Sequence, residues 1–164
     1  MKILGVDPGL QITGYGVISV PQDYPANKKM ALVEAGIIRT VRTAGIAERL
    51  QKIHDSLSEL IEEIRPDVLV LEKLFAHYKH PSTAILMGHA RGVVCLLGGT
   101  KDVPLVSIAS THVKKAVCGS GHASKLQVQR AIQYHLGLAK LPEPPDVADA
   151  LAAAISYIFT LRAK

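Results

Sequence analysis

The sequence predicts an α/β fold in which a mixed five-stranded sheet carries helices on both faces. Three strand-like segments come first, at Lys2 to Asp7, Thr13 to Val20 and Met30 to Thr40, and their short links favour an antiparallel meander. Helices and strands then alternate, which is typical of crossover units that add parallel strands to a sheet. With 164 residues, the whole chain (1–164) is expected to form one domain with its own core.

The alternating part of the chain is assigned from the spacing of its apolar residues. Between Ile46 and Ile64 they recur at intervals of three and four, and Pro66 follows, so a helix is expected there. The run from Asp67 to Glu72 is almost continuously apolar, which is typical of a buried central strand. The remaining expected elements are a helix from Ser82 to Leu97 that ends at Gly98-Gly99, a strand from Pro104 to Ile108, and helices near Ser110 to Cys118, Ser124 to Leu136 and Pro144-Pro145 to Arg162.

Composition narrows the class of protein. The net charge is +5 and the isoelectric point is about 9.3, which favours a polyanionic partner. The two cysteines, Cys95 and Cys118, form neither a disulfide framework nor a zinc site, so a reducing, cytoplasmic compartment is expected. The N-terminal segment lacks the pattern of a signal peptide, and no apolar run of the roughly 18 residues needed to span a membrane is expected.

Two carboxylates stand at the ends of predicted strands. Asp7 ends the strand GVD, where Pro8 favours an extended backbone for Asp7 and Gly9 permits a tight turn. Glu72 ends the strand VLVLE, where a charge at the end of a buried strand is costly unless it is paired or bound to a metal. Each residue alone also fits an ordinary strand end. If the two strands are neighbours in the sheet, the two carboxylates lie side by side.

Asp146 and Asp149 begin the last predicted helix, in the segment PPDVADALAAAI. Because they are three residues apart they share a helix face, with Cβ atoms roughly 5–6 Å apart. Their mutual repulsion would be relieved by a divalent cation, and the helix N-terminus favours their charged forms. Ordinary N-capping explains one aspartate at this place more easily than two. The small residues from Ala150 to Ala154 would let this helix approach the sheet closely.

The four carboxylates Asp7, Glu72, Asp146 and Asp149 together would offer the hard oxygen ligands that Mg²⁺ prefers, with Mn²⁺ as a substitute. Two ions roughly 3.5–4 Å apart would activate a water and stabilise the leaving oxygen in phosphodiester hydrolysis. If these four of the 14 acidic residues hold metal, the 19 basic residues outnumber the other ten acids by nine. A basic surface around a small acidic site predicts a divalent-metal-dependent nuclease.

Several residues are candidates for contact with DNA. Lys114 and Lys115 share one short helix, and Lys125 follows the glycine-rich GSGHAS loop at a helix start, a place that suits a phosphate. Phe75 and Tyr78 come just after Glu72 and could stack on an unpaired base. Solvated lysines and a core position for Phe75 are the alternatives. The complete candidate set is Phe75, Tyr78, Lys79, Arg91, Lys114, Lys115 and Lys125.

Several motifs, in order along nearly the whole chain, resemble the RuvC family of bacterial Holliday-junction resolvases. They are ILGVDPG…TGYGVI, VLVLEKLF, STAILMGHARGVV, VKKAVCGSGHASKLQVQ and DVADALAAAI. The resemblance implies a ribonuclease H-like fold, a symmetric homodimer and paired, symmetric nicks in four-way junctions, made together with the RuvA and RuvB branch-migration proteins. It also implies that Lys114 and Lys125 lie near the scissile phosphate and that Phe75 opens the junction centre. The implied catalytic carboxylates are Asp7, Glu72, Asp146 and Asp149.

The sequence departs from the family pattern mainly after Phe75. The segment AHYKHPS is one residue longer than usual, with Lys79-His80 and Pro81 where an asparagine is common, and His89 replaces a frequent glutamine. These differences bear on the DNA contacts of the loop and on any sequence preference. They do not affect the four acids, of which the third, a histidine in some relatives, is Asp146 here.

Three other functions fit parts of the pattern. A related ribonuclease H-like nuclease could cut RNA–DNA hybrids, and cleavage assays on both substrates would distinguish it. A sugar-kinase-like or actin-like ATPase also cradles phosphates with segments such as GVDPG…TGYG, but that fold needs two such domains. A junction-binding protein without catalysis would not need four intact carboxylates. In a two-fold dimer, the candidate interface elements are the helix from Ile46 to Ile64 and the helix that carries Arg91.

Overall fold

The computed structural model describes residues 1–21, 30–73 and 81–162 of the chain. The strands and helices follow the predicted order. They are β1 (Lys2–Asp7), β2 (Ile12–Ser19), β3 (Ala31–Arg39), α1 (Ile46–Ile64), β4 (Val68–Glu72), α2 (Pro81–Thr100), β5 (Leu105–Ile108), α3 (Ser110–Cys118), α4 (Lys125–Leu136) and α5 (Pro145–Arg162).

The predicted end of α2 is wrong. The helix continues through Gly98 and Gly99 to Thr100, and the chain turns only at Asp102, which has a left-handed backbone conformation with φ of 53°. Gly98 serves a different purpose, because a Cβ there would come within 3.3 Å of the Leu105 side chain. The glycine therefore brings the end of α2 close to β5 rather than ending the helix.

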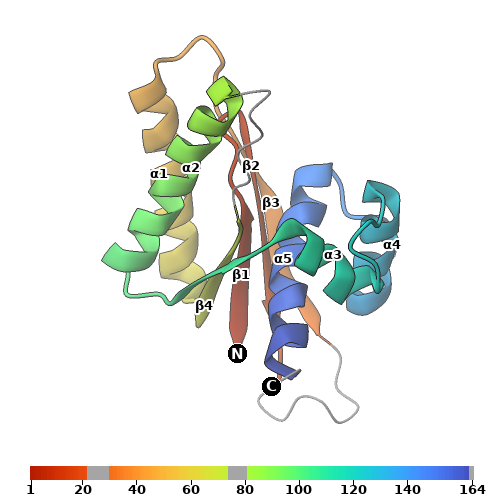
Figure 1. Cartoon of the computed structure of the whole chain (residues 1–164). Coiled ribbons are helices and arrows are strands. Elements are labelled where there is room, and N and C mark those ends of the chain that lie inside the picture. Colours follow the sequence, from red (N-terminus) through yellow and green to blue (C-terminus); the bar gives the residue numbers. More distant parts are fainter. Residues whose placement is uncertain (22–29, 74–80, 163–164) are drawn as a thin grey trace.

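The five strands form one mixed sheet in the order β3-β2-β1-β4-β5, as Figure 1 shows. β1 pairs antiparallel with β2, and β2 pairs antiparallel with β3. β4 lies parallel to β1, and β5 lies parallel to β4. The predicted arrangement, an antiparallel meander extended by parallel strands, is confirmed.

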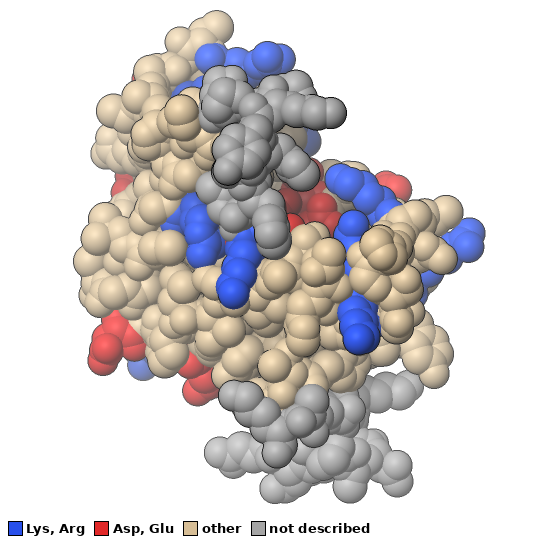
Figure 2. Space-filling view, in the orientation of Figure 1, with Lys and Arg blue, Asp and Glu red and all other residues tan. Residues whose placement is uncertain are grey.

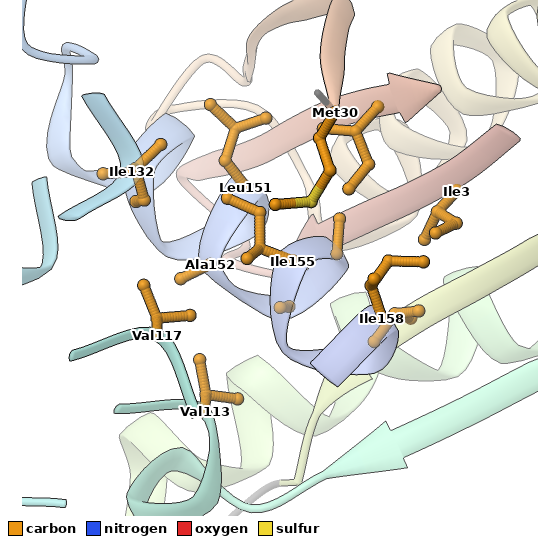
Figure 3. Close-up of a cluster of buried hydrophobic side chains, with 14 of the residues drawn as sticks. Ile3, Met30, Val113, Val117, Ile132, Leu151, Ala152, Ile155 and Ile158 are labelled. Carbon is orange, nitrogen blue, oxygen red and sulfur yellow. The ribbon is translucent and has the colours of Figure 1, made fainter. Parts of the chain in front are cut away.

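Helices cover both faces of this sheet, as predicted. In Figure 1, α1 and α2 lie on one side, and α3, α4 and α5 lie on the other. Successive residues of β1 point into opposite layers: Ile3 belongs to the core under α5, and Leu4 belongs to the core under α1 and α2. Figure 3 shows the first of these cores, where Leu151, Ile155 and Ile158 of α5 pack over Ile3.

Helix α5 lies unusually close to β1 and β2 because glycines lie beneath it. A Cβ built on Gly5 would overlap the carbonyl oxygen of Ala150, and one built on Gly14 would overlap the carbonyl oxygen of Asp146. The helix presents small side chains to the sheet, because Ala150, Ala152, Ala153 and Ala154 are all buried. The expectation that these alanines permit close approach is confirmed, and the glycines complete the fit from the sheet.

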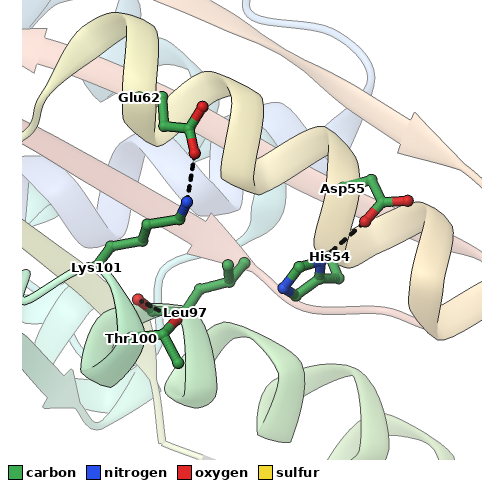
Figure 4. A network of polar contacts seen from close by, with 6 residues as sticks. All are labelled: His54, Asp55, Glu62, Leu97, Thr100 and Lys101. Carbon is green, nitrogen blue, oxygen red and sulfur yellow. Dashed lines mark hydrogen bonds and ion pairs between the residues drawn. The ribbon is translucent and has the colours of Figure 1, made fainter.

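Helix α2 differs from expectation in one further respect. In the described part of the chain it is the one helix that is long and apolar enough, by length and composition alone, to cross a membrane, and only 22% of the window Thr83–Thr100 is buried. Its inner side packs against the sheet and α1 through Ala90, Val94 and Leu97. An ion pair between Lys101 and Glu62 of α1 joins the ends of the two helices (Figure 4). The outer side of α2 remains apolar.

Replacing Gly5 by alanine should strongly destabilise the protein. The added methyl would force α5 away from β1, and overpacking of this kind costs about 1–3 kcal/mol or more. The Gly99→Ala change is a matched control, because nothing lies within 4 Å of a Cβ at this position in α2. It should leave stability unchanged or raise it by up to about 1 kcal/mol. Denaturant unfolding of both variants measures the difference, and equal stabilities would contradict the close contact.

Candidate active site

Asp7 and Glu72 leave the sheet at neighbouring strand ends. β1 and β4 are parallel with Val6 opposite Leu71, so the next residues, Asp7 and Glu72, emerge at the same edge. The turn after Asp7 is closed by the hydroxyl of Thr13, a buried residue that donates to the carbonyl oxygen of Gly9 at 2.8 Å. The sequence-based expectation that these two carboxylates are neighbours therefore agrees with the strand order.

The end of β4 is held by an arginine from helix α2. The guanidinium of Arg91 donates to the carbonyl oxygen of Glu72 at 2.8 Å and to the hydroxyl of Ser107 at 2.7 Å. Arg91 is thus engaged inside the protein, between α2, β4 and β5. Ser110, the first residue of α3, lies close enough to the carboxyl group of Glu72 to lower its pKa.

Asp146 and Asp149 reach the same edge from the first turns of α5. The backbone of Asp146 rests on Gly14, and a Cβ built on that glycine would lie 3.0 Å from the Cβ of Asp146. Gly14 in turn pairs with Asp7 in the sheet. The close contact of α5 with β2 therefore places Asp146 across from Asp7, and Asp149 follows one turn later on the same helix face.

The four carboxylates influence one another electrostatically. Burial, followed by the negative charges of Asp149, Glu72 and Asp146, raises the pKa of Asp7 to about 7, although Lys125 opposes the shift. Burial is also the main cause that raises the pKa values of Glu72 and Asp149. The nearby positive charges of Lys114 and Lys125 therefore do not fully offset the burial and mutual repulsion of these carboxyl groups.

A divalent cation fits the chemistry of this donor set. Within residues 1–21, 30–73 and 81–162, no three His, Cys, Asp or Glu side chains stand in positions that would hold a metal ion as they are. The carboxylates nevertheless share one edge of the sheet and offer only oxygen, which hard cations prefer. A cation between them would offset the repulsion that raises the pKa of Asp7.

Two of the predicted lysines face the carboxylates. Lys114 of α3 lowers the pKa values of Glu72 and Asp149, and the Nζ atom of Lys125 lies 3.9 Å from a carboxylate oxygen of Asp149. Lys115 lies beside Lys114 on α3, but within the described residues its charge is not among the causes that shift these carboxyl groups. Figure 2 shows acidic side chains gathered in a hollow of the surface with basic side chains on both sides.

The other predicted DNA contacts are placed differently. Phe75, Tyr78 and Lys79 lie outside the described residues.

Sequence reasoning did not identify Ser110, although its position just after β5, at the end of a parallel strand, could have indicated it. It also missed Arg42 and Arg49, which line a cleft beside Asp146. No local pattern marks these two arginines, because only the tertiary fold brings them to the site.

Comparison with known proteins identifies the family. The model of the family "Crossover junction endodeoxyribonuclease RuvC" matches residues 3–157. The chain belongs to the RuvC family. It is therefore an endodeoxyribonuclease, a hydrolase of phosphodiester bonds in DNA.

Individual relatives agree along nearly the whole chain. The crossover junction endodeoxyribonuclease RuvC of Rhodopirellula baltica is 48% identical over 93% of this chain and 83% of its own. The RuvC protein of Pelotomaculum thermopropionicum is 43% identical over 96% of this chain and 92% of its own. The solved structure of Thermus thermophilus RuvC in complex with a Holliday junction substrate superposes with a TM-score of 0.91 at 31% identity, covering 99% of this chain and 96% of that one. The predicted ribonuclease H-like fold is confirmed.

The raised pKa of Asp7 predicts how metal-free stability depends on pH. The carboxyl group titrates near pH 4 when the chain is unfolded and near 7 when it is folded, so the native state holds more protons in between. Without metal, stability should therefore fall as the pH rises from about 4 to about 7. Asp7→Asn removes this dependence, so in EDTA it should raise the melting temperature clearly at pH 8 and by a smaller amount at pH 5.

Asp102→Asn is the control for this comparison. It makes the same chemical change at an exposed turn, whose left-handed conformation asparagine also tolerates. Thermal melts of the two variants and the unmodified protein at both pH values give the answer. An equal gain for Asp7→Asn at pH 5 and pH 8 would show that the charge of Asp7 is not what destabilises the folded protein.

Proposed function

We propose that this chain, acting as one domain, resolves four-way DNA junctions by paired, symmetric nicks at a site made of Asp7, Glu72, Asp146 and Asp149. The observation that supports this most is the electrostatic coupling of Asp7 to the three other acids, which come from β4 and α5, at one edge of the sheet. Mg²⁺ is the proposed cation, with two ions per subunit and Mn²⁺ as a substitute. A four-way junction as substrate is supported by the Thermus thermophilus relative, which was solved in complex with a Holliday junction substrate.

The residues of the chain have distinct roles in this proposal. The four carboxylates hold the cations, which when bound supply an activated water and neutralise the leaving oxygen. Arg91 holds the backbone of Glu72, and Ser110 favours the charged form of its carboxylate. Lys114 and Lys125 face the carboxylates from α3 and α4 and would balance the charge of the phosphate that is cut.

A homodimer is part of the same proposal, because a junction needs two opposed cuts and each subunit carries one site. We place the interface on the outer side of α2, where Ile85 and Leu96 are 60% and 58% exposed. A row of large apolar side chains in water favours contact with a second protein surface. Helix α1, the other candidate, buries most of its apolar side in the core.

The cellular setting follows the family expectation. We propose that the enzyme works in the bacterial cytoplasm with the RuvA and RuvB branch-migration proteins. The free thiols of Cys95 and Cys118 suit a reducing compartment.

The amide variants Asp7→Asn, Glu72→Gln, Asp146→Asn and Asp149→Asn test the catalytic site. Each keeps the shape of the side chain and removes one negative charge, so each should lower the cleavage rate by several orders of magnitude. Binding of a synthetic four-way junction should hold or tighten, because a charge that repels the phosphate is lost. Ca²⁺ should support binding but support cleavage poorly, since its looser coordination misplaces the water.

Cleavage rates in Mg²⁺ and junction affinities in EDTA, measured side by side, separate catalysis from binding. Glu62→Gln is a suitable control, because this exposed acid on α1 pairs with Lys101 and lies away from the site. It should cleave at the normal rate. Normal cleavage by any one of the four variants would remove that residue from the site, and normal cleavage by Asp7→Asn would overturn the proposal.

Leu96→Lys should convert the dimer to a monomer. A lysine in the middle of an apolar interface must lose its hydration without a partner, which opposes association. Leu126→Lys, a change of the same kind at an exposed position of α4, should leave the dimer intact. Light scattering gives the mass of each variant. A monomeric mass for the unmodified protein at concentrations where it cleaves normally would contradict the dimer, and a dimeric Leu96→Lys would move the interface elsewhere.

A further inference from the structure

A cleft of about 490 Å³ opens beside Asp146, on the side of the carboxylates away from α3 and α4. Its walls come from four separate parts of the chain: the turn between β1 and β2, the segment from β3 into α1, the first turns of α2, and Asp146 itself. The proposed catalytic roles do not use this cleft. It nevertheless adjoins the site, because Asp146 belongs to both.

Two arginines give the cleft an excess of positive charge. Arg42 and Arg49 line it, and Asp146 is the one acidic residue among its described lining residues. Arg42 is exposed, and within the described part of the chain it forms no ion pair and no side-chain hydrogen bond. If Asp146 is occupied with a cation, the cleft offers two positive charges to an anion.

Arg49 is held in position at one end only. Its Nε atom donates to the hydroxyl of Thr40 at 3.0 Å, and that hydroxyl donates to the carbonyl oxygen of Leu10 at 2.6 Å. Among the described residues nothing bonds to the two terminal nitrogens. A guanidinium oriented in this way, with two parallel donors remaining, matches the geometry of a phosphate.

Apart from Gln11 and Thr83, the other side chains that line the cleft are apolar. Leu10 and Ile12 line it from the β1–β2 turn, and Leu86 and Met87 line it from α2. A cleft lined by both basic and apolar side chains suits a nucleic-acid strand, which presents charged phosphates as well as sugar and base carbons.

We propose that this cleft is a second DNA subsite, in which Arg42 and Arg49 bind a backbone phosphate that neighbours the one held over the carboxylates. The inference rests on the proposed function, because it takes a junction strand as the occupant. One strand carries a charge about every 3.4 Å along the duplex axis, so a strand with one phosphate at Asp146 has others within reach. The strand then crosses the edge of the sheet from Lys114 and Lys125 on one side to Arg42 and Arg49 on the other.

The test measures junction binding rather than cleavage, so its result is independent of the catalytic proposal. Affinity for a synthetic four-way junction is measured in EDTA at several salt concentrations for Arg42→Gln, Arg49→Gln and Arg65→Gln. Arg65 is the matched control, because it is exposed at the far end of α1, roughly 24 Å along the helix axis from Arg49. Arg49→Lys keeps the positive charge but removes the guanidinium that bonds to Thr40, so it separates the two contributions to binding. Thermal melts show whether loss of the bond to Thr40 destabilises the fold.

Arg42→Gln should weaken binding roughly tenfold, as expected for one charge-assisted hydrogen bond, and lower the slope of log affinity against log salt by about 0.9. Arg65→Gln should change neither. The contact is located with junctions that carry one neutral methylphosphonate at successive positions of the strand that is cut. At one position, the methylphosphonate should weaken junction binding by the unmodified protein. At the same position it should not change junction binding by Arg42→Gln. Equal losses for Arg42→Gln and Arg65→Gln, or methylphosphonate effects that are the same in both proteins, would overturn the subsite.

Discussion

The contact on which the rest of the site depends is the one between the backbone of α5 and the glycines of β1 and β2. Gly14 faces the backbone of Asp146, and Gly5 faces the backbone of Ala150. A side chain at either position would overlap the backbone of α5 and force the helix away from the sheet. The distance between the acids of α5 and the acids of β1 and β4 is thus set by residues that take no part in chemistry.

This arrangement works against the stability of the free protein. The acids share a partly buried edge where burial and mutual repulsion raise the pKa of Asp7 to about 7. Two lysines reduce the repulsion without cancelling it, since Asp7 remains shifted with Lys125 nearby. Burial of the large apolar cores on both faces of the sheet stabilises the folded protein and offsets the cost of bringing these acids together. The unfavourable charge is also what attracts a cation, so the cost and the function have one origin.

Much of the fold and of the carboxylate set could be predicted because both follow from local patterns. Spacing of apolar residues located every helix and strand, and the order of elements placed β1 beside β4, which made Asp7 and Glu72 neighbours. Features that depend on contacts between distant segments were not predictable. Gly98 reads as a helix end in sequence but serves as a contact for Leu105. Arg91 has the pattern of a surface cation, yet its guanidinium is used inside the protein.

The hydrogen bonds of Arg91 connect helix α2, which is exposed on its outer side, to the strand that carries Glu72. A guanidinium is planar, and its two donors keep a fixed separation. The bonds to Glu72 and Ser107 therefore fix the position of α2 relative to β4 and β5. Helix α2 cannot rotate about its own axis without pulling on the backbone that carries Glu72. In the proposed dimer, the helix that carries the subunit contact on its outer side would also hold the backbone of Glu72 on its inner side.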